Sequence, residues 1–419
     1  MNELTSRRIN VLTALQRCRE RATGYLQSQV YVTELGHAWR HSPTHNPRSH
    51  PDHLLYGTWA GALASVLLGV DRVFDDETRQ RIGAALFAFQ QPDGSFVMDR
   101  VPESARGGHN REYFTFHCTN YALGAARALG LPLRYPLIFV EAFATADQLR
   151  KWLSKRDWTQ PWREGNNIVN LASFYAMLAE TGRPWAGERL EALADWHDAH
   201  QNPTTGFWHA GDGRGTHLLK ALAGGAHNLH IYHSLGRPIP RAQRIVDSCL
   251  RLGYLGVGSA CVDIDVVDIL SHLRPLGHRV REIDSVLERY LLELLPLQNV
   301  DGGFGDNYVT PQTTYGLVTP TGVSTTWTTY FRLATLGMIT CTLFPDQCDR
   351  WTFRNTLGMG YFHPGLLGGP TGRAVPVAGP QLSLSLQRWL TARRGLRFAR
   401  HRLTYRVRGW LATKALLWR

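Results

Sequence analysis

The last part of this chain contains no acidic residue. After Asp349 there is neither Asp nor Glu, whereas residues 350–419 carry 13 of the 46 Lys and Arg residues. The formal net charge of +12 therefore belongs to the C-terminal end, because residues 1–349 balance 33 basic against 34 acidic side chains. The same charges could bind the phosphates of nucleic acid, which therefore competes with an anionic membrane surface as the partner of this end, but nucleic acid is not the expected partner.

Long apolar runs and closely spaced cysteines are also missing. No run of 18 apolar residues occurs, so we expect no membrane-spanning helix. Residues 1–21 lack the apolar core of a signal peptide. The six cysteines show no CxxC spacing, which predicts reduced thiols and no zinc site. Together these absences predict a cytoplasmic protein.

A short phrase recurs three times, a Gln followed six residues later by Phe with a Gly between them. The copies are QQPDGSF at 90–96, QNPTTGF at 201–207 and QNVDGGF at 298–304. Each copy follows a helical pattern and opens a turn in which Gly can adopt positive φ. Starts 111 and 97 residues apart predict one copy for every two helical hairpins.

Helical periodicity divides most of the chain into pairs of helices, and no long alternating run indicates a strand. The first members begin near Tyr56, Tyr113, Gly165, Thr216, Cys261 and Thr321. The second members lie near 76–90, 137–153, 186–200, 240–252, 280–297 and 345–357. Six such pairs predict an all-α fold, an (α/α)6 toroid over residues 1–357 with an extra N-terminal helix at 3–35 packed outside. Residues 358–387 are rich in Gly and Pro and predict a linker or covering loop.

The first member of each pair is apolar on all sides, and the second is amphipathic, so the first members should form the inner ring. Their N-terminal ends would then meet at one mouth of the barrel. Polar and aromatic side chains gather at these ends and are candidate substrate-binding residues: Tyr56, Trp59, Phe114, His117, Glu164, Asn167, Asn170, His227, Tyr232, Trp327, Tyr330 and Phe331.

Three carboxylates lie within six residues of an otherwise apolar stretch. They are Asp263, Asp265 and Asp268, and the last two share a helix face. Apolar surroundings and a neighbouring carboxylate both raise a carboxyl pKa. The cluster therefore predicts a neutral carboxylic acid that can donate a proton. The alternative is a helix cap and two structural carboxylates bonded to backbone or Arg.

The Gln-to-Phe repeats resemble the QW-type repeats of squalene-hopene cyclases, and the toroid resembles the terpenoid cyclase and protein prenyltransferase superfamily. Class II terpene cyclases carry a DxDD acid, and here DIDV at 263–266 followed by Asp268 makes a DxDxxD variant. The resemblance implies a class II isomerase that cyclises an isoprenoid by protonating an alkene, with Asp265 as donor and Asp263 and Asp268 setting its acidity. It implies no required cofactor, and Mg²⁺ only for a diphosphate-bearing substrate.

Other functions stay open. A polysaccharide lyase could use Asn166 and Asn167 with His227 and Tyr232, and an inverting glycosidase could use Glu164 and Asp265. A prenyltransferase would need a zinc site, and a degenerate toroid could act as a scaffold. The cavity discriminates between these classes. A cyclase needs a closed, apolar, aromatic cavity, whereas a glycan-active enzyme needs an open groove with Arg and Lys.

The C-terminal tail at 388–419 combines ten basic residues with three Trp residues and no acid. Basic amphipathic segments with Trp are typical of chains that lie on an anionic membrane surface. The tail therefore predicts peripheral association with the inner membrane face. The alternative is a helix that packs on the toroid.

Overall fold

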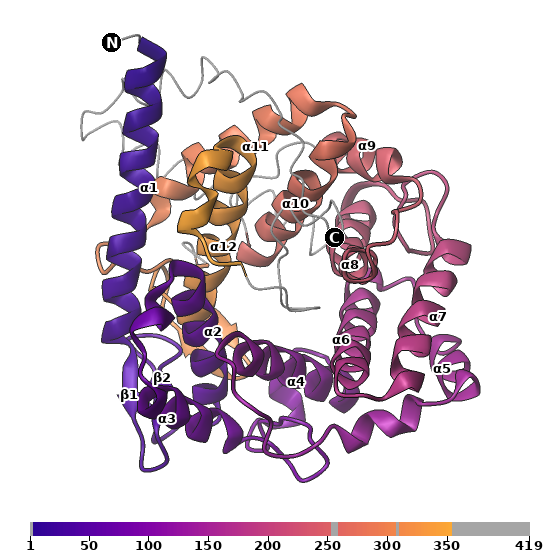
Figure 1. The fold of residues 1–419 in the computed structure, drawn as a ribbon, viewed down its shortest axis with the longest axis horizontal. Coiled ribbons are helices and arrows are strands. Elements are labelled where there is room, and N and C mark those ends of the chain that lie inside the picture. Colours follow the sequence, from indigo (N-terminus) through magenta and orange to yellow (C-terminus); the bar gives the residue numbers. More distant parts are fainter. Residues whose placement is uncertain (1–2, 253–258, 307–309, 354–419) are drawn as a thin grey trace.

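The computed structural model describes residues 3–252, 259–306 and 310–353, and most of these are helical. Two concentric layers of helices surround a central axis, as Figure 1 shows in a view down that axis. This arrangement confirms the predicted all-α toroid. The predicted linker at 358–387 and the basic tail at 388–419 lie outside the described residues.

The inner layer is a closed ring in which each helix packs on the next and the last packs on the first. Its members are α2 (His53–Leu68), α4 (Arg111–Ala128), α6 (Pro161–Glu180), α8 (Gly215–Leu235), α10 (Ala260–Leu273) and α12 (Thr326–Leu343). All six were predicted as first members. Helices α6 and α8 approach closely because Gly165 and Gly224 face each other. A Cβ added at Gly224 would lie 2.1 Å from the Pro161 carbonyl oxygen.

The outer layer contains five of the predicted second members: α3 (Asp76–Phe87), α5 (Ala146–Leu153), α7 (Pro184–His200), α9 (Ala242–Leu252) and α11 (Val280–Leu294). The sixth prediction is wrong, because Pro345–Arg350 forms only a 3-10 turn. The N-terminal helix α1 (Glu3–Ser28) packs on both α2 and α12 and takes the sixth outer position. The N-terminal helix is therefore a member of the ring rather than an addition to it.

The three repeated phrases connect consecutive outer helices. In each copy the Gln amide donates to the Gly carbonyl of its own turn and to a backbone carbonyl of the next hairpin. The second acceptors are Tyr135 for Gln90, Pro240 for Gln201 and Cys18 for Gln298, at 2.9, 2.7 and 2.8 Å. The Phe of every copy is fully buried. The third copy thus holds α1 in place and helps to close the ring.

Two short hairpins complete the described structure. Strands β1 (Val30–Val32) and β2 (His37–Trp39) follow α1, and β3 (Gln312–Thr314) pairs with β4 (Leu317–Thr319) before α12. The second hairpin lies at the mouth, where the Tyr56 hydroxyl donates to the Tyr315 hydroxyl at 3.1 Å.

Two further expectations concern the cysteines and the membrane. Cys341 and Cys348 form a disulfide, so the prediction that all six thiols are reduced is wrong. The bond joins the end of α12 to the 3-10 turn that follows it.

Among the residues that the structure describes, no helix is both long and apolar enough to cross a membrane.

Candidate active site

A cavity of about 850 Å³ opens at the mouth where the inner helices begin. Every inner helix contributes to its wall, mostly from its first half, with Tyr121 and His227 just past the middle of α4 and α8: Tyr56, Tyr113, His117, Tyr121, Trp162, Arg163, Asn166, Lys220, His227, Cys261, Asp265, Trp327 and Phe331. The segment 104–109 and the turn between β3 and β4 form the rim, where Gly107 and Gly316 are exposed. Its volume is within the range of small-molecule sites, roughly 300–1,000 Å³.

One wall of the cavity is a column of rings on α4. His109 stacks on Tyr113 with ring centroids 3.9 Å apart, and Tyr113 stacks on His117 at 5.5 Å. His117 in turn meets Tyr121 edge-on at 4.6 Å. His109 lies just before α4, and the spacing of four residues places Tyr113, His117 and Tyr121 on one face of the helix. The column thus runs from the rim toward the centre of the ring.

Asp265 is the acidic residue of this cavity, and it lies on α10 with only 1% of its surface exposed. Its Oδ2 atom is buried with no hydrogen-bond partner among the described residues. Burial raises the pKa of Asp265 well above its usual range, and the nearby Asp268 and Asp263 raise it further. The protonated form of this carboxyl is therefore favoured.

The other two members of the acidic cluster do not line the cavity. Asp263 forms a buried ion pair with Arg332 of α12, but burial outweighs this pairing and raises its pKa to about 6. Burial alone would also raise the pKa of Asp268, but His272 and His230 hold it below its usual range. His230 Nε2 lies 2.8 Å from Asp268 Oδ2. Both side chains therefore connect inner helices rather than contact a ligand.

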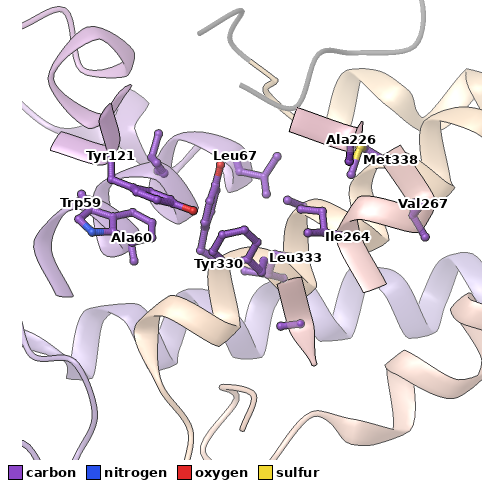
Figure 2. Close-up of a cluster of buried hydrophobic side chains, with 14 of the residues drawn as sticks. Trp59, Ala60, Leu67, Tyr121, Ala226, Ile264, Val267, Tyr330, Leu333 and Met338 are labelled. Carbon is purple, nitrogen blue, oxygen red and sulfur yellow. The ribbon is translucent and has the colours of Figure 1, made fainter. Parts of the chain in front are cut away.

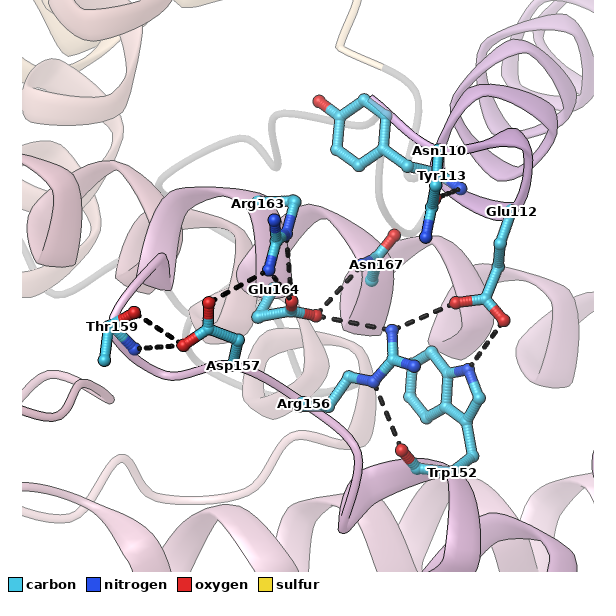
Figure 3. A network of polar contacts seen from close by, with 10 residues as sticks. All are labelled: Asn110, Glu112, Tyr113, Trp152, Arg156, Asp157, Thr159, Arg163, Glu164 and Asn167. Atoms are coloured by element: carbon cyan, nitrogen blue, oxygen red, sulfur yellow. Dashed lines mark hydrogen bonds and ion pairs between the residues drawn. The ribbon is translucent and has the colours of Figure 1, made fainter. Parts of the chain in front are cut away.

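Glu164 is occupied by neighbouring side chains, as Figure 3 shows. Arg163 donates to it at 3.0 Å, Asn167 at 3.0 Å and Arg156 at 3.3 Å. Arg156 also binds Glu112 of α4 at 3.0 Å, so the network joins α4 to α6. Glu164 and Asn167 are absent from the cavity wall. The structure thus does not bring the expected pair of carboxylates, Glu164 and Asp265, together in the wall of this cavity.

Several other candidate residues serve as packing between helices. Trp59 lies against Tyr121 at 4.0 Å and near Tyr330, in the buried cluster of Figure 2. Asn120 donates to Asn170 at 2.7 Å across α4 and α6. The Tyr232 hydroxyl donates to Asp198 of α7 at 2.6 Å and faces the outer layer. Of the predicted binding residues, the cavity wall contains Tyr56, His117, His227, Trp327 and Phe331.

Two imidazoles of the wall are neutral bases. Burial lowers the pKa of His117 to about 3, with the nearby His109 and His227 adding to the effect. Burial likewise lowers the pKa of His227 to about 3. His117 Nδ1 is buried with no hydrogen-bond partner in the described part of the chain. Each ring is therefore neutral and can accept a hydrogen bond from a bound molecule.

Sequence reasoning missed the cationic groups of the cavity. Arg106 lies in the rim with its guanidinium 5.1 Å from the centroid of the Phe114 ring, and its Nε atom is buried without a partner among the described residues. Lys220 lies on α8, seven residues before His227 and on the same helix face. Neither Arg106 nor Lys220 forms an ion pair with any acidic residue that the structure describes. The helical spacing could have revealed Lys220, whereas no periodic signal marks the loop that holds Arg106.

Metal binding finds no support in this site. No group of three or more His, Cys, Asp or Glu side chains within residues 3–252, 259–306 and 310–353 could hold a metal ion. The Mg²⁺ that a diphosphate-bearing substrate would need and the zinc site that a prenyltransferase would need are therefore unsupported in the described structure.

No known family model matches this chain, and no curated protein matches it. Among solved structures it is similar to an inactive variant of alpha-1,6-mannanase, GH76A of Salegentibacter sp. HEL1_6, in complex with alpha-1,6-mannotetrose. The two share 14% identity, and the match covers 78% of this chain and 99% of that chain with a TM-score of 0.40. The activity and the bound oligosaccharide are properties of that protein.

The expected membership of the terpenoid cyclases is wrong, and so are the class II cyclase activity, the isomerase class and the isoprenoid substrate. The solved structure found is a glycan-cleaving mannanase, not a terpene cyclase. The cavity gives a physical reason for this correction. A carbocation needs apolar walls and aromatic faces. Here the cations Arg106 and Lys220 would repel it, and the lone pairs of His117 would capture it.

Proposed function

We propose that this protein is a glycan-cleaving enzyme that works in the cavity at the mouth of the inner ring. The observation that carries the proposal is a protonated carboxyl, Asp265, inside a cavity whose walls combine ring faces with hydrogen-bonding groups. A sugar ring has apolar C–H faces that pack on aromatic rings, and hydroxyl groups that need donors and acceptors. The column of Tyr113, His117 and Tyr121 offers both.

Cleavage of a glycosidic bond requires a proton on the departing oxygen. Asp265 can supply it, because its raised pKa favours the un-ionised carboxyl. The unused hydrogen-bonding capacity of its Oδ2 atom supports this role. A structural carboxyl would instead be bound by neighbouring donors, as Glu164 is by three side chains.

The proposal is tested by incubating the full-length protein with a panel of neutral and acidic polysaccharides and measuring the release of reducing ends. We expect cleavage of at least one glycan, and we expect Asp265→Asn to lower the rate by about 10² or more because the proton donor is removed. The matched control is Asp247→Asn, which changes a carboxyl that pairs with His278 on the outside of the ring. Cleavage that survives in Asp265→Asn would reject the assignment.

The predicted location on the inner membrane face concerns residues 388–419 and stays a prediction from their composition. Membrane association is measured by co-sedimentation with liposomes that contain acidic lipid. The full-length chain is compared with a chain that lacks residues 388–419. Equal sedimentation of the two chains would contradict it.

A further inference from the structure

The cavity carries more positive charge than its acidic residue can balance. Arg106 and Lys220 lack acidic partners among the described residues, and burial favours the uncharged form of Asp265. The third cation of the wall, Arg163, is already paired with Glu164 at 2.9 Å and Asp157 at 3.3 Å. The inner helices also point their N-terminal ends, which carry partial positive charge, toward this mouth. An occupant that carries a negative charge would be favoured here.

The cavity also lacks the second carboxylate that glycoside hydrolysis generally requires. Inverting and retaining hydrolases both place a pair of Asp or Glu residues on the two sides of the scissile bond. Asp265 is the single Asp or Glu among the described residues of the wall. A reaction that needs one acid and one neutral base fits this set of groups better.

The ring order places such an acid and base opposite each other. In the closed sequence α2, α4, α6, α8, α10 and α12, helix α4 lies three positions from α10. His117 of α4 and Asp265 of α10 both line the cavity and thus approach a bound molecule from opposite walls. A sugar between them would have a base on one side and an acid on the other.

Building on the function proposed above, we propose that the substrate is a polyuronate, a glycan with a carboxylate on its sugar rings, and that the bond breaks by β-elimination. Arg106 and Lys220 bind and neutralise the uronate carboxylate, which makes the neighbouring C5 proton more acidic. The bound carboxylate also raises the pKa of the nearby His117 ring, and His117 takes that proton. The electron pair forms the C4=C5 double bond, the C4–O bond breaks, and the departing oxygen takes the proton of Asp265. The reaction consumes no water, and proton exchange with solvent restores both side chains.

The chemistry is tested on a panel of polyuronates, each compared with its own carboxyl-reduced form. Two signals are recorded, the release of reducing ends and the ultraviolet absorbance of the unsaturated uronate product. The proposal expects both signals to rise together on a polyuronate and neither on its reduced form. Reducing ends without the absorbance would overturn elimination and leave the glycan-cleaving function standing. No cleavage of any glycan would overturn both.

The charge recognition is tested separately by calorimetric binding of a polyuronate oligosaccharide to the Asp265→Asn variant. Adding Arg106→Gln or Lys220→Gln to that variant should weaken binding about tenfold or more, because each change removes a charged hydrogen-bond donor. Arg106→Lys should retain part of the affinity, and Lys155→Gln on the exposed surface should change nothing. Equal binding of the oligosaccharide and its carboxyl-reduced form would overturn the proposal.

Discussion

At the scale of single residues, the site depends on keeping one carboxyl protonated beside another that stays ionised. Asp265 and Asp268 lie three residues apart on α10, so their side chains share a helix face. His230 and His272 stabilise the charge on Asp268, and that charge disfavours a second charge on Asp265. The buried side chains of His230 and His272 thus affect the pKa of Asp265 through Asp268, without lining the cavity themselves.

The first prediction concerns the pH dependence of catalysis. Activity requires protonated Asp265, so it should be lost as the pH rises through the raised pKa of this group. Asp268→Asn removes a neighbouring negative charge and should lower that pKa, which moves the alkaline limb of kcat/KM to lower pH. The pH profile of the variant checks this, with Asp247→Asn as the control that leaves the limb in place. If the alkaline limb of kcat/KM does not move in Asp268→Asn, the charge of Asp268 does not raise the pKa of Asp265.

The second prediction concerns stability. Between the ordinary carboxyl pKa of 3.8 and the raised value in the folded protein, Asp265 keeps a proton that the unfolded chain releases, so stability falls as pH rises. Asp265→Asn cannot release a proton and should therefore be more stable than the wild type near neutral pH. Below the ordinary carboxyl pKa the two proteins should unfold alike. Urea denaturation at both pH values measures the difference, and a variant that is less stable at neutral pH would contradict the assigned protonation state.

Part of the site could be predicted from sequence because its residues lie on regular elements. His117, His227 and Asp265 were found because they are polar residues on apolar inner helices, although His227 lies past the middle of α8. Glu164 was misjudged, because sequence does not show that Arg156 from the preceding segment reaches it. Arg106 belongs to a loop whose position depends on tertiary packing rather than on any periodic pattern.

At the scale of elements, the repeated phrase is a structural device. Its Gln joins two outer helices, its Gly allows the close approach of the next backbone, and its Phe fills the space behind the turn. A Cβ added at Gly302 would lie 2.1 Å from the Arg21 carbonyl oxygen of α1. Any ring of helical hairpins needs such connections. The resemblance of these repeats to those of cyclases therefore concerned the architecture and not the chemistry.

The third prediction follows from the copy that holds α1. Gln298→Ala removes both amide bonds and leaves the buried carbonyl oxygens of Cys18 and Gly302 without this donor, at a cost of about 1–3 kcal/mol. Amide hydrogen exchange should rise along α1 more than along α6, which lies across the ring. The matched control, Gln201→Ala, should instead loosen the segment around Pro240. Unchanged exchange of α1 in Gln298→Ala would show that this contact does not secure the helix.

At the scale of the whole molecule, the first helix of the chain and the last inner helix lie side by side and complete the ring. Sequence could predict the inner helices from their composition, but not which segment occupies the sixth outer position. Residues 345–357 were predicted for that position and the N-terminal helix was predicted to pack outside the ring. Only packing across about 300 residues of chain decides which segment completes it. The closed ring then brings six helix N-termini to one mouth, and this places the cavity.

The most direct test of the central claim is a crystal structure of the Asp265→Asn variant with a bound acidic oligosaccharide. We predict sugar rings in the cavity between His117 and position 265, with a carboxylate at Arg106 and Lys220 and a glycosidic oxygen beside the substituted side chain. An oligosaccharide bound elsewhere on the protein, with this cavity free of sugar, would contradict the account.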